Sequence, residues 1–338
     1  MIEKENMIVL DEDITDSNYG SDPHSRKIKD LLDYGLVCVD KPSGPTSHEV
    51  VAWVRQMLNI GKAGHSGTLD PMVTGLLPIG LGHGTKALTT LLLGPKEYIA
   101  IARLHSPVDD PKLARIMKEF TGEIYQTPPQ RSAVKRARRT RTIYALDLVE
   151  RQGNLLIFRI LCQAGTYVRK LVYDMGEILG PGATMIELRR TRVSNLNDEK
   201  GLVRLHDFFD AVSRFKESGD ETGLRLVVTP IEASLTNLKS MIIRDSAIEA
   251  ICQGAQLAIP GILGVTGDMA PGDNLAVYSQ KGEVVAIGKA QMSINDIRDL
   301  EKGIAFLTDR VIMKAGTYPK MWKTKEAREK PEAQQEEA

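Results

Sequence analysis

The chain has few cysteines and no excess of charge of either sign. Three of its 338 residues are cysteines, Cys38, Cys162 and Cys252, and no two of them have CxxC spacing. A disulfide framework and a cysteine-based zinc site are therefore not expected. Lysine and arginine together number 44, as do aspartate and glutamate, which excludes a uniformly basic coat protein. A local basic patch is still compatible with this balance.

Long apolar runs are also missing. No run reaches the length of a membrane span, and the acidic N-terminus (MIEKENMIVLDEDITDSNYG) lacks the apolar region of a signal peptide. Apolar residues nevertheless make up 42% of the chain, enough to build cores. The length suits two domains. We expect a soluble, cytoplasmic protein.

The chain divides into four segments. Residues 1–27 form an acidic extension that is either disordered or packed as an edge strand, and residues 321–338 form a charged tail. Residues 28–235 mix strands and helices without a strict βαβ rhythm, which indicates an α+β sheet domain rather than a doubly wound one. Residues 237–320 hold short strand-like pieces between glycine turns, typical of a small β-barrel with one or two helices.

Local patterns place several elements. A buried strand is expected at 36–39, followed by a helix that begins with a Thr46–Glu49 capping box. Further strands are expected at 98–104 and 155–161. A helix should open at 165–166 and end at Gly180 and Pro181.

The densest stretch for chemistry is 64–78. Its glycines and prolines argue against a long regular element, and its apolar character places it inside the protein. A carboxylate there, Asp70, needs partners because burying a lone charge is costly. Asp70 is either a functional acid or a residue that only ties the loop. Arg169, in the first turn of its helix, is either the ion-pair partner of Asp70 or a solvated residue.

Two other patterns give weaker evidence for a ligand site. Residues 80–86 resemble a phosphate loop, but the threonine precedes the lysine, so a nucleoside triphosphate site is not expected. His65 and His83 lack metal-ligand spacing, and no metal is expected.

Basic residues cluster in two places without intervening acids. They suit phosphate neutralisation, the alternative being a solvated face paired to acids elsewhere. The candidate RNA-binding patch comprises Arg131, Lys135, Arg136, Arg138, Arg139, Arg141, Arg189 and Arg190.

Five motifs in order resemble those of the TruB-type pseudouridine synthases, and most closely the archaeal dyskerin homologues. The resemblance covers roughly residues 31–318. The motifs are KPSGPTS at 41–47, HSGTLDP at 65–71, KEY at 96–98, GTYVR at 165–169 and LRRTR at 188–192. Together they are highly specific, although each alone is weak.

The resemblance implies an isomerase that converts uridine in RNA to pseudouridine without a cofactor or metal. Asp70 would be the nucleophile, Tyr98 would stack on the target base, and Arg169 would hold Asp70 ionised and aimed. Attack on C1′, attack on C6 and deprotonation of C2′ are all left open. The resemblance also implies a substrate-binding set of Lys41, Pro42, His65, Thr68, Tyr167 and Leu188.

Two features favour the dyskerin type over stand-alone bacterial tRNA enzymes. The motif PPQRSAVKR at 128–136 lies close to the next strand, without a longer RNA-gripping insert, and the 237–320 block resembles a PUA domain. The resemblance implies an H/ACA guide RNA, rRNA and tRNA substrates, and three partners: a small zinc-ribbon protein, a small β-barrel protein and a kink-turn-binding protein. Alternatives are a non-catalytic scaffold of that particle, or a hydrolase that acts without RNA.

Overall fold

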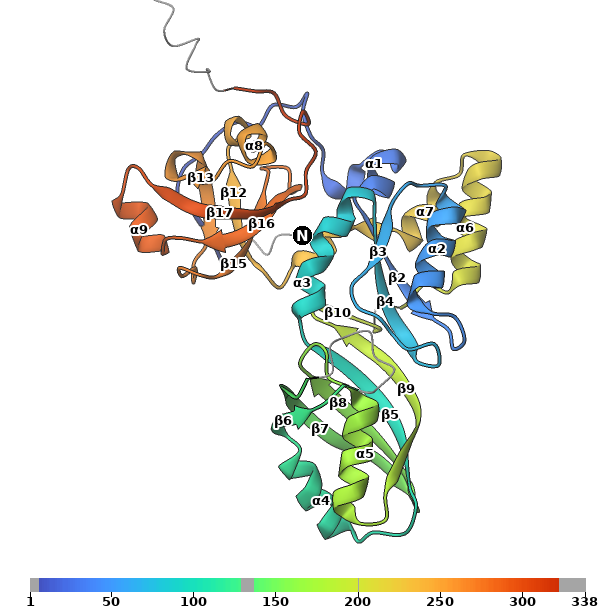
Figure 1. Ribbon diagram of the computed structural model, residues 1–338. Helices are drawn as coiled ribbons and strands as arrows, with labels where there is room; N and C mark the ends of the chain where they lie inside the picture. Colours follow the sequence, from blue (N-terminus) through green and yellow to red (C-terminus); the bar gives the residue numbers. More distant parts are fainter. Residues whose placement is uncertain (1–5, 129–136, 200, 322–338) are drawn as a thin grey trace, which may run out of the picture. The chain divides into compact units, whose positions relative to one another are not determined.

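The computed structural model describes residues 6–128, 137–199 and 201–321. The chain forms two compact units. The larger unit comprises Lys27–Asn237, and the smaller one combines Met1–Arg26 with Leu238–Ala338 (Figure 1). The acidic N-terminal segment therefore belongs with the second folded block of the sequence.

The larger unit is built around a ten-stranded sheet in the order β11-β2-β4-β9-β5-β8-β7-β6, with β3 and β10 pairing at β4 and β9. Its strands are β2 (Gly35–Lys41), β3 (Ala63–His65), β4 (Thr74–Leu81), β5 (Lys96–Leu104), β6 (Gly122–Gln126), β7 (Arg139–Gln152), β8 (Leu155–Cys162), β9 (Ala183–Val193), β10 (Leu196–Asn197) and β11 (Thr229–Pro230). Its helices are α1 (Ile28–Asp33), α2 (Ser47–Leu58), α3 (Leu88–Leu93), α4 (Asp110–Glu119), α5 (Val168–Leu179), α6 (Leu205–Ser218) and α7 (Thr222–Val227), with 3₁₀ turns η3 (Gly82–Ala87) and η4 (Ile231–Leu235).

This sheet has two halves joined by a narrow seam. Strand β9 pairs with β5 along nine residues from Lys96 to Leu104, but with β4 only at Thr74 and Gly75. Each half has its own core. One core lies among β2, β4, α2 and α6, and the other lies between β5, β7, β8 and the helices α4 and α5. A residue at the seam can therefore contact elements of both halves.

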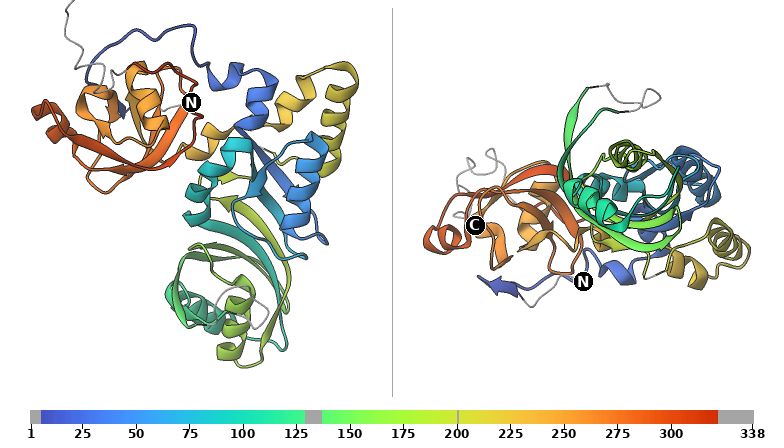
Figure 2. Two further views of the ribbon diagram at one scale, coloured as in Figure 1. Left: turned by 45° about the horizontal axis from the view of Figure 1, so that its top comes forward. Right: turned by 90° about the horizontal axis from the view of Figure 1, so that it is seen from below.

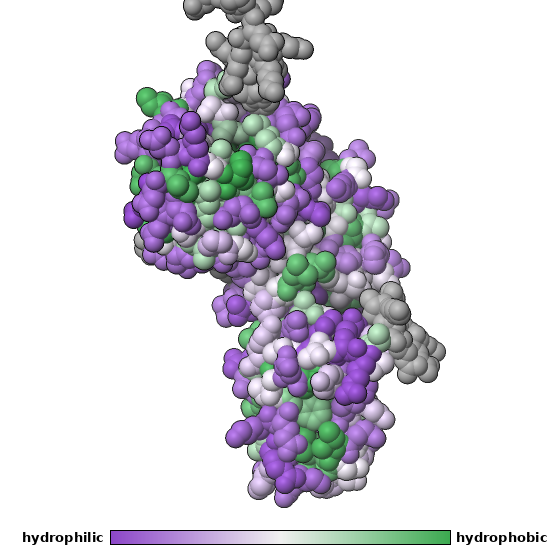
Figure 3. All heavy atoms as spheres, turned by 60° about the vertical axis from the view of Figure 1, so that its left-hand side comes forward, coloured by the Kyte–Doolittle hydropathy of each residue, from purple (hydrophilic) through white to green (hydrophobic). Residues whose placement is uncertain are grey.

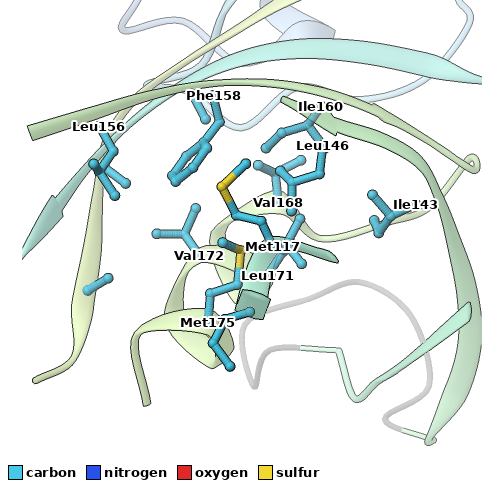
Figure 4. Packing of buried hydrophobic residues seen from close by; sticks show 14 of the residues in the cluster. Met117, Ile143, Leu146, Leu156, Phe158, Ile160, Val168, Leu171, Val172 and Met175 are labelled. Atoms are coloured by element: carbon cyan, nitrogen blue, oxygen red, sulfur yellow. The ribbon is translucent and has the colours of Figure 1, made fainter. Parts of the chain in front are cut away.

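The second core illustrates how the helices are held (Figure 4). Leu171, Val172 and Met175 recur at helical spacing on α5 and are at most 3% exposed. They pack with Met117 of α4 against Phe158 of β8, and the two helices cover one face of the sheet (Figures 1 and 2). This packing fixes α5 and hence the position of Arg169 in its first turn.

The smaller unit is a seven-stranded mixed sheet in the order β1-β14-β12-β15-β16-β17-β13. Its elements are β1 (Met7–Val9), η2 (Pro23–Ser25), β12 (Lys239–Ile243), α8 (Asp245–Cys252), β13 (Leu257–Ala258), η5 (Ile259–Gly261), β14 (Ile262–Thr266), β15 (Asn274–Tyr278), β16 (Val284–Ala290), α9 (Ile294–Asp299) and β17 (Ile304–Val311).

The described part of the N-terminal segment packs as an edge strand, the second of the two alternatives. Met7 to Val9 pair with Gly264 to Thr266 of β14. Beyond β1, Arg244 forms ion pairs with Asp11 and Asp13. The buried carboxylate of Asp245 accepts hydrogen bonds from the Thr15 hydroxyl and the Asp16 amide at 2.8 and 2.9 Å.

The expected strands and helices are present, including the Thr46–Glu49 capping box at the start of α2, although α5 begins at Val168 rather than at 165–166. The 64–78 stretch differs from expectation because its last five residues begin the eight-residue strand β4, which passes through Pro78. Pro78 lacks an amide proton, but its carbonyl points away from β2 and accepts a hydrogen bond from the Ser66 amide, just after β3, at 3.2 Å. In a strand the N and C=O of one residue point to the same side, so the ring removes no hydrogen bond to β2.

The surface is mixed in character. On the face drawn in Figure 3, hydrophilic residues interrupt the apolar ones. Within residues 6–128, 137–199 and 201–321, no helix has both the length and the apolar character needed to cross a membrane.

Candidate active site

Asp70 lies in a loop that connects β3 to β4. The loop is closed on itself, because the Val73 amide donates to the Asp70 carbonyl at 3.0 Å. The Gly44 amide donates to the Pro71 carbonyl at 2.9 Å and ties the neighbouring KPSG turn to the loop. Leu69 and Val73 are each 3% exposed and anchor the loop in the core. The loop thus has a fixed backbone on either side of Asp70.

Two buried polar side chains support this loop from below. The Lys41 ammonium is fully buried and donates to the carbonyls of Pro42, Pro71 and Val73 at 2.8–2.9 Å. Burial lowers the pKa of Lys41, and the negative charge of Asp70 opposes that shift. The buried Ser47 hydroxyl accepts from the Leu69 amide at 2.8 Å and lies 3.1 Å from the Leu69 carbonyl.

The Asp70 carboxylate itself points to solvent. Its Oδ2 accepts a hydrogen bond from Nη2 of Arg169 at 3.0 Å, and both side chains are 60% exposed. The structure thus brings the two residues together, but the expectation that Asp70 is buried is wrong. Apolar neighbours bury the backbone of the loop and leave its carboxylate outside, where an incoming molecule can reach it.

Tyr98 lies on β5, directly opposite Arg190 of β9. Burial raises the pKa of the Tyr98 phenol, and the positive charge of the adjacent Arg190 opposes this shift. Arg190 is 1% exposed and also donates to the carbonyls of Leu76 at 2.9 Å and Gly67 at 3.1 Å. Its prediction as part of an RNA-binding patch is wrong, because a side chain this buried does not present its charge to phosphates.

His65 and Thr68 lie on the N-terminal side of the loop. Nδ1 of His65 accepts from the Gly67 amide at 3.2 Å, and its ring meets that of His48 edge-on with centroids 5.0 Å apart. Burial, together with the positive charges of His48 and Arg190, lowers the pKa of His65 to about 4. The imidazole is therefore neutral near pH 7. Thr68 is exposed.

Tyr167 is the N-cap residue of α5, and Leu188 lies on β9. The backbone of Tyr167 is held at both ends by Gln126, which accepts from its amide at 3.0 Å and donates to its carbonyl at 3.1 Å. Its hydroxyl accepts from Nη2 of Arg139 at 3.4 Å. Leu188 is half-buried and packs on the core beneath α5.

The basic patch is only partly described. Arg131, Lys135 and Arg136 lie outside the described residues. Arg138 stacks over the exposed ring of Tyr125 at 4.2 Å, and Arg139 lies 5.5 Å from the centroid of Tyr167. Arg141 is half-buried and lies against Gly165.

Arg189 is committed to other partners. It forms a bidentate pair with Asp40 at 2.8 and 3.3 Å, and its Nε lies 3.8 Å from Asp198.

Sequence reasoning missed several supporting residues. Ser47 lies between the two capping-box residues, Thr46 and Glu49. Its hydroxyl takes no part in the capping box, and this was the one sign in the sequence of a tertiary role. Lys96 is buried and donates to three carbonyls at the end of α3 at 2.5–2.9 Å, and burial lowers its pKa to about 8. Gln126 gave no signal in the sequence. Within the described residues, no group of three acidic, histidine or cysteine side chains could hold a metal ion.

The chain matches several family models in succession. They are the DKCLD domain (1–51), the N-terminal domain of TruB family pseudouridylate synthases (55–111), the C-terminal domain of Pus10 (93–189), the C-terminal domain of tRNA pseudouridylate synthase B (169–236) and the PUA domain (239–312).

Relatives that align along nearly the whole chain agree with these family matches. "Probable tRNA pseudouridine synthase B" of Methanocaldococcus jannaschii is 48% identical over 323 residues, 96% of either chain. Its namesake in Methanopyrus kandleri is 50% identical over 94% of this chain and 93% of that one.

Two solved structures are similar along nearly the whole chain. One is an H/ACA RNP bound to a substrate RNA containing 2′-deoxyuridine (41% identity, TM-score 0.86, covering 94% of this chain and 97% of that one). The other is a Cbf5–Nop10–Gar1 complex (43% identity, TM-score 0.86, covering 93% and 96%). With relatives this close over nearly the full length, this chain belongs to the TruB family of pseudouridine synthases, and it carries the PUA domain.

Proposed function

We propose that this chain isomerises uridine to pseudouridine in RNA, chiefly at ribosomal RNA positions selected by an H/ACA guide RNA, with tRNA position 55 as a further target. The observation that carries the proposal is the exposed Asp70–Arg169 pair on a loop whose backbone is held rigidly. An exposed carboxylate with a fixed backbone can meet a nucleotide that has left its stack.

Asp70 is the proposed nucleophile. The glycosidic bond between C1′ and N1 breaks, the uracil turns, a bond forms between C1′ and C5, the C5 proton is lost, and N1 takes up a proton. Attack at C1′, attack at C6 and removal of the C2′ proton all begin with the same ionised carboxylate, so the geometry supports each equally. The guanidinium of Arg169, 3.0 Å from Asp70, orients that carboxylate through a charge-assisted hydrogen bond.

The remaining residues form the proposed pocket. Tyr98 stacks on the uracil and assists loss of the C5 proton, while Tyr167 and Leu188 line the walls. Neutral His65, together with Thr68, contacts the flipped nucleotide. Lys41 and Pro42 hold the loop.

The proposed partners follow from the similar structures, which hold Cbf5 with Nop10, Gar1 and substrate RNA. We extend to this chain a guide RNA, a small zinc-ribbon protein, a small β-barrel protein and a kink-turn-binding protein, and a cytoplasmic location. Residues 28–235 form the proposed catalytic domain. Residues 237–320 hold the guide RNA, and the basic residues Arg138, Arg139 and Arg141 contact RNA phosphates.

The test is tritium release from RNA labelled with [5-³H]uridine. The protein is assayed with bare tRNA, and then with an rRNA fragment, a matching H/ACA guide and the partner proteins. Release only in the guided reaction supports a ribonucleoprotein subunit, and release from bare tRNA adds a stand-alone activity. RNA binding without release in either reaction contradicts the proposal and favours a non-catalytic scaffold.

A further inference from the structure

Arg190 is the largest side chain of the larger unit that is almost fully buried, and its charge is not matched by an acid. Within residues 6–128, 137–199 and 201–321, no carboxylate forms an ion pair with it. It donates hydrogen bonds to neutral oxygens, the carbonyls of Leu76 and Gly67, and its charge interacts with the neutral phenol of Tyr98. A buried cation without an acid is costly, so stability alone does not account for an arginine at this position.

The position of Arg190 accounts for this. It lies at the seam of the sheet, where β9 pairs with Gly75 of β4 on one side and with Tyr98 of β5 on the other. The approach is close: a Cβ on Gly75, whose φ is +100°, would lie 2.3 Å from the Arg190 carbonyl. Glycine therefore lets β4 approach β9 closely enough for the guanidinium to reach the Asp70 loop.

The contacts of Arg190 join the two sides of the active site. Gly67 and Leu76 bracket the segment that carries Asp70, so one guanidinium binds the loop on both sides of the carboxylate. The same group reaches Tyr98, which comes from the other half of the sheet. Burial is the main cause of the lowered pKa of Lys41, His65 and Lys96, and the positive charge of Arg190 adds to each shift.

We propose that Arg190 is a positioning residue for the isomerisation. It fixes the Asp70 loop and the Tyr98 ring relative to one another across the seam, and it places a constant positive charge beneath groups that carry negative charge during the reaction. This assignment rests on the proposed function.

The test compares the buried Arg190 with an exposed arginine of the same sheet. Arg190→Lys keeps the charge but loses the planar fork that binds several oxygens at once, and Arg190→Gln keeps an amide donor but loses the charge. Arg159→Lys is the matched control, because Arg159 of β8 is exposed and pairs with Asp147 rather than with the loop. Each protein is assembled with guide RNA and partners, and single-turnover tritium release, RNA affinity and thermal melting are measured.

The expected result separates rate from binding. Both Arg190 variants should lose about 100-fold in single-turnover rate, as expected when reacting groups are misplaced by about 1 Å, with RNA affinity unchanged within about two-fold. Arg159→Lys should stay within about three-fold of the wild-type rate, because it changes neither the loop nor Tyr98.

Three outcomes decide the matter. Folded Arg190 variants with wild-type rates overturn the assignment. So does loss of folding in both variants, since that would make Arg190 a stability residue. An inactive wild-type protein is a failure of the proposed function instead, and is recognised because it precedes any comparison of variants.

Discussion

The site has an exposed layer and a buried layer, and both contain cations. In the exposed layer, Arg169 pairs with the carboxylate of Asp70, and both side chains are 60% exposed. In the buried layer, Lys41 and Arg190 are at most 1% exposed and bind backbone carbonyls. The reactive group is thus left open to substrate, while its position is set from beneath.

The two layers should differ in what they contribute. An exposed ion pair adds little to stability, about 0–1 kcal/mol, because water screens it. Buried donors that satisfy carbonyls matter more, since an unsatisfied buried carbonyl costs about 1–3 kcal/mol. Substitutions in the exposed layer should therefore damage chemistry alone, and those in the buried layer should damage both chemistry and stability.

Asp70→Asn is the sharpest test of the exposed layer. The amide is nearly isosteric but is not a nucleophile, so guided pseudouridine formation should fall by at least about 10³-fold, the scale seen when a catalytic group acts as part of a unit. Melting should hardly change, because the lost ion pair is exposed. Tritium release and thermal melting measure the two effects.

The control is Asp147→Asn, which breaks another exposed aspartate–arginine pair, that with Arg159 at 3.0 Å. It should alter neither activity nor melting. If Asp70→Asn retained full pseudouridine formation, Asp70 would not be the nucleophile and the scaffold interpretation would gain.

Lys41→Met tests the buried layer. Methionine fills a similar volume but leaves the carbonyls of Pro42, Pro71 and Val73 without their donor. We expect a loss of about 2–4 kcal/mol in the free energy of unfolding, partly offset by removal of a buried charge. The single-turnover rate should fall as well, because the Asp70 loop loses the hydrogen bonds from Lys41 that hold its backbone. Denaturant titration and tritium release report the two losses.

The exposed Lys62 offers a comparison for this variant. Lys62→Met should leave both measurements unchanged. A Lys41→Met protein with normal stability and normal rate would show that the other contacts of the loop suffice, and the contrast between the layers would fail.

The residues of the exposed layer could be predicted well from the sequence, and those of the buried layer poorly. The HSGTLDP and GTYVR motifs led to Asp70 and Arg169, and the capping-box spacing at Thr46 correctly predicted the start of α2. The membership of the family also agrees with the resemblance. Motif order is a local property, and local properties survive in a single sequence.

Which side chains are buried depends on the pairing of strands that are far apart in the sequence, and this pairing could not be predicted from the sequence. Arg190 lies beside Arg189 in one basic run, and only the register of β9 with β4 and β5 sends one arginine into the seam and the other to Asp40. Asp70 was expected to be buried because its neighbours are apolar, yet the loop turns its carboxylate outward. Composition of a segment does not decide the direction of each side chain.

His65 gives the smallest predicted effect, and it probes the boundary between the layers. Its pKa is lowered from 6.5 to about 4 in the folded protein. Between these values the unfolded chain binds more protons than the folded one, so stability falls as the pH falls from 6.5 to 4 and is unaffected above that window. We expect a loss of about 1–2 kcal/mol, less than the full pKa difference implies because the ring is only partly buried.

The measurement is the free energy of unfolding by denaturant at several pH values between 4 and 8. His65→Gln should flatten the curve below pH 6.5, because it removes the group that the unfolded state protonates. His206→Gln, at an exposed position on α6, should keep the wild-type slope. If His65→Gln had the wild-type slope as well, the His65 ring would be open to solvent like the exposed layer. The charges of the buried cations would then have no effect on the pKa of His65.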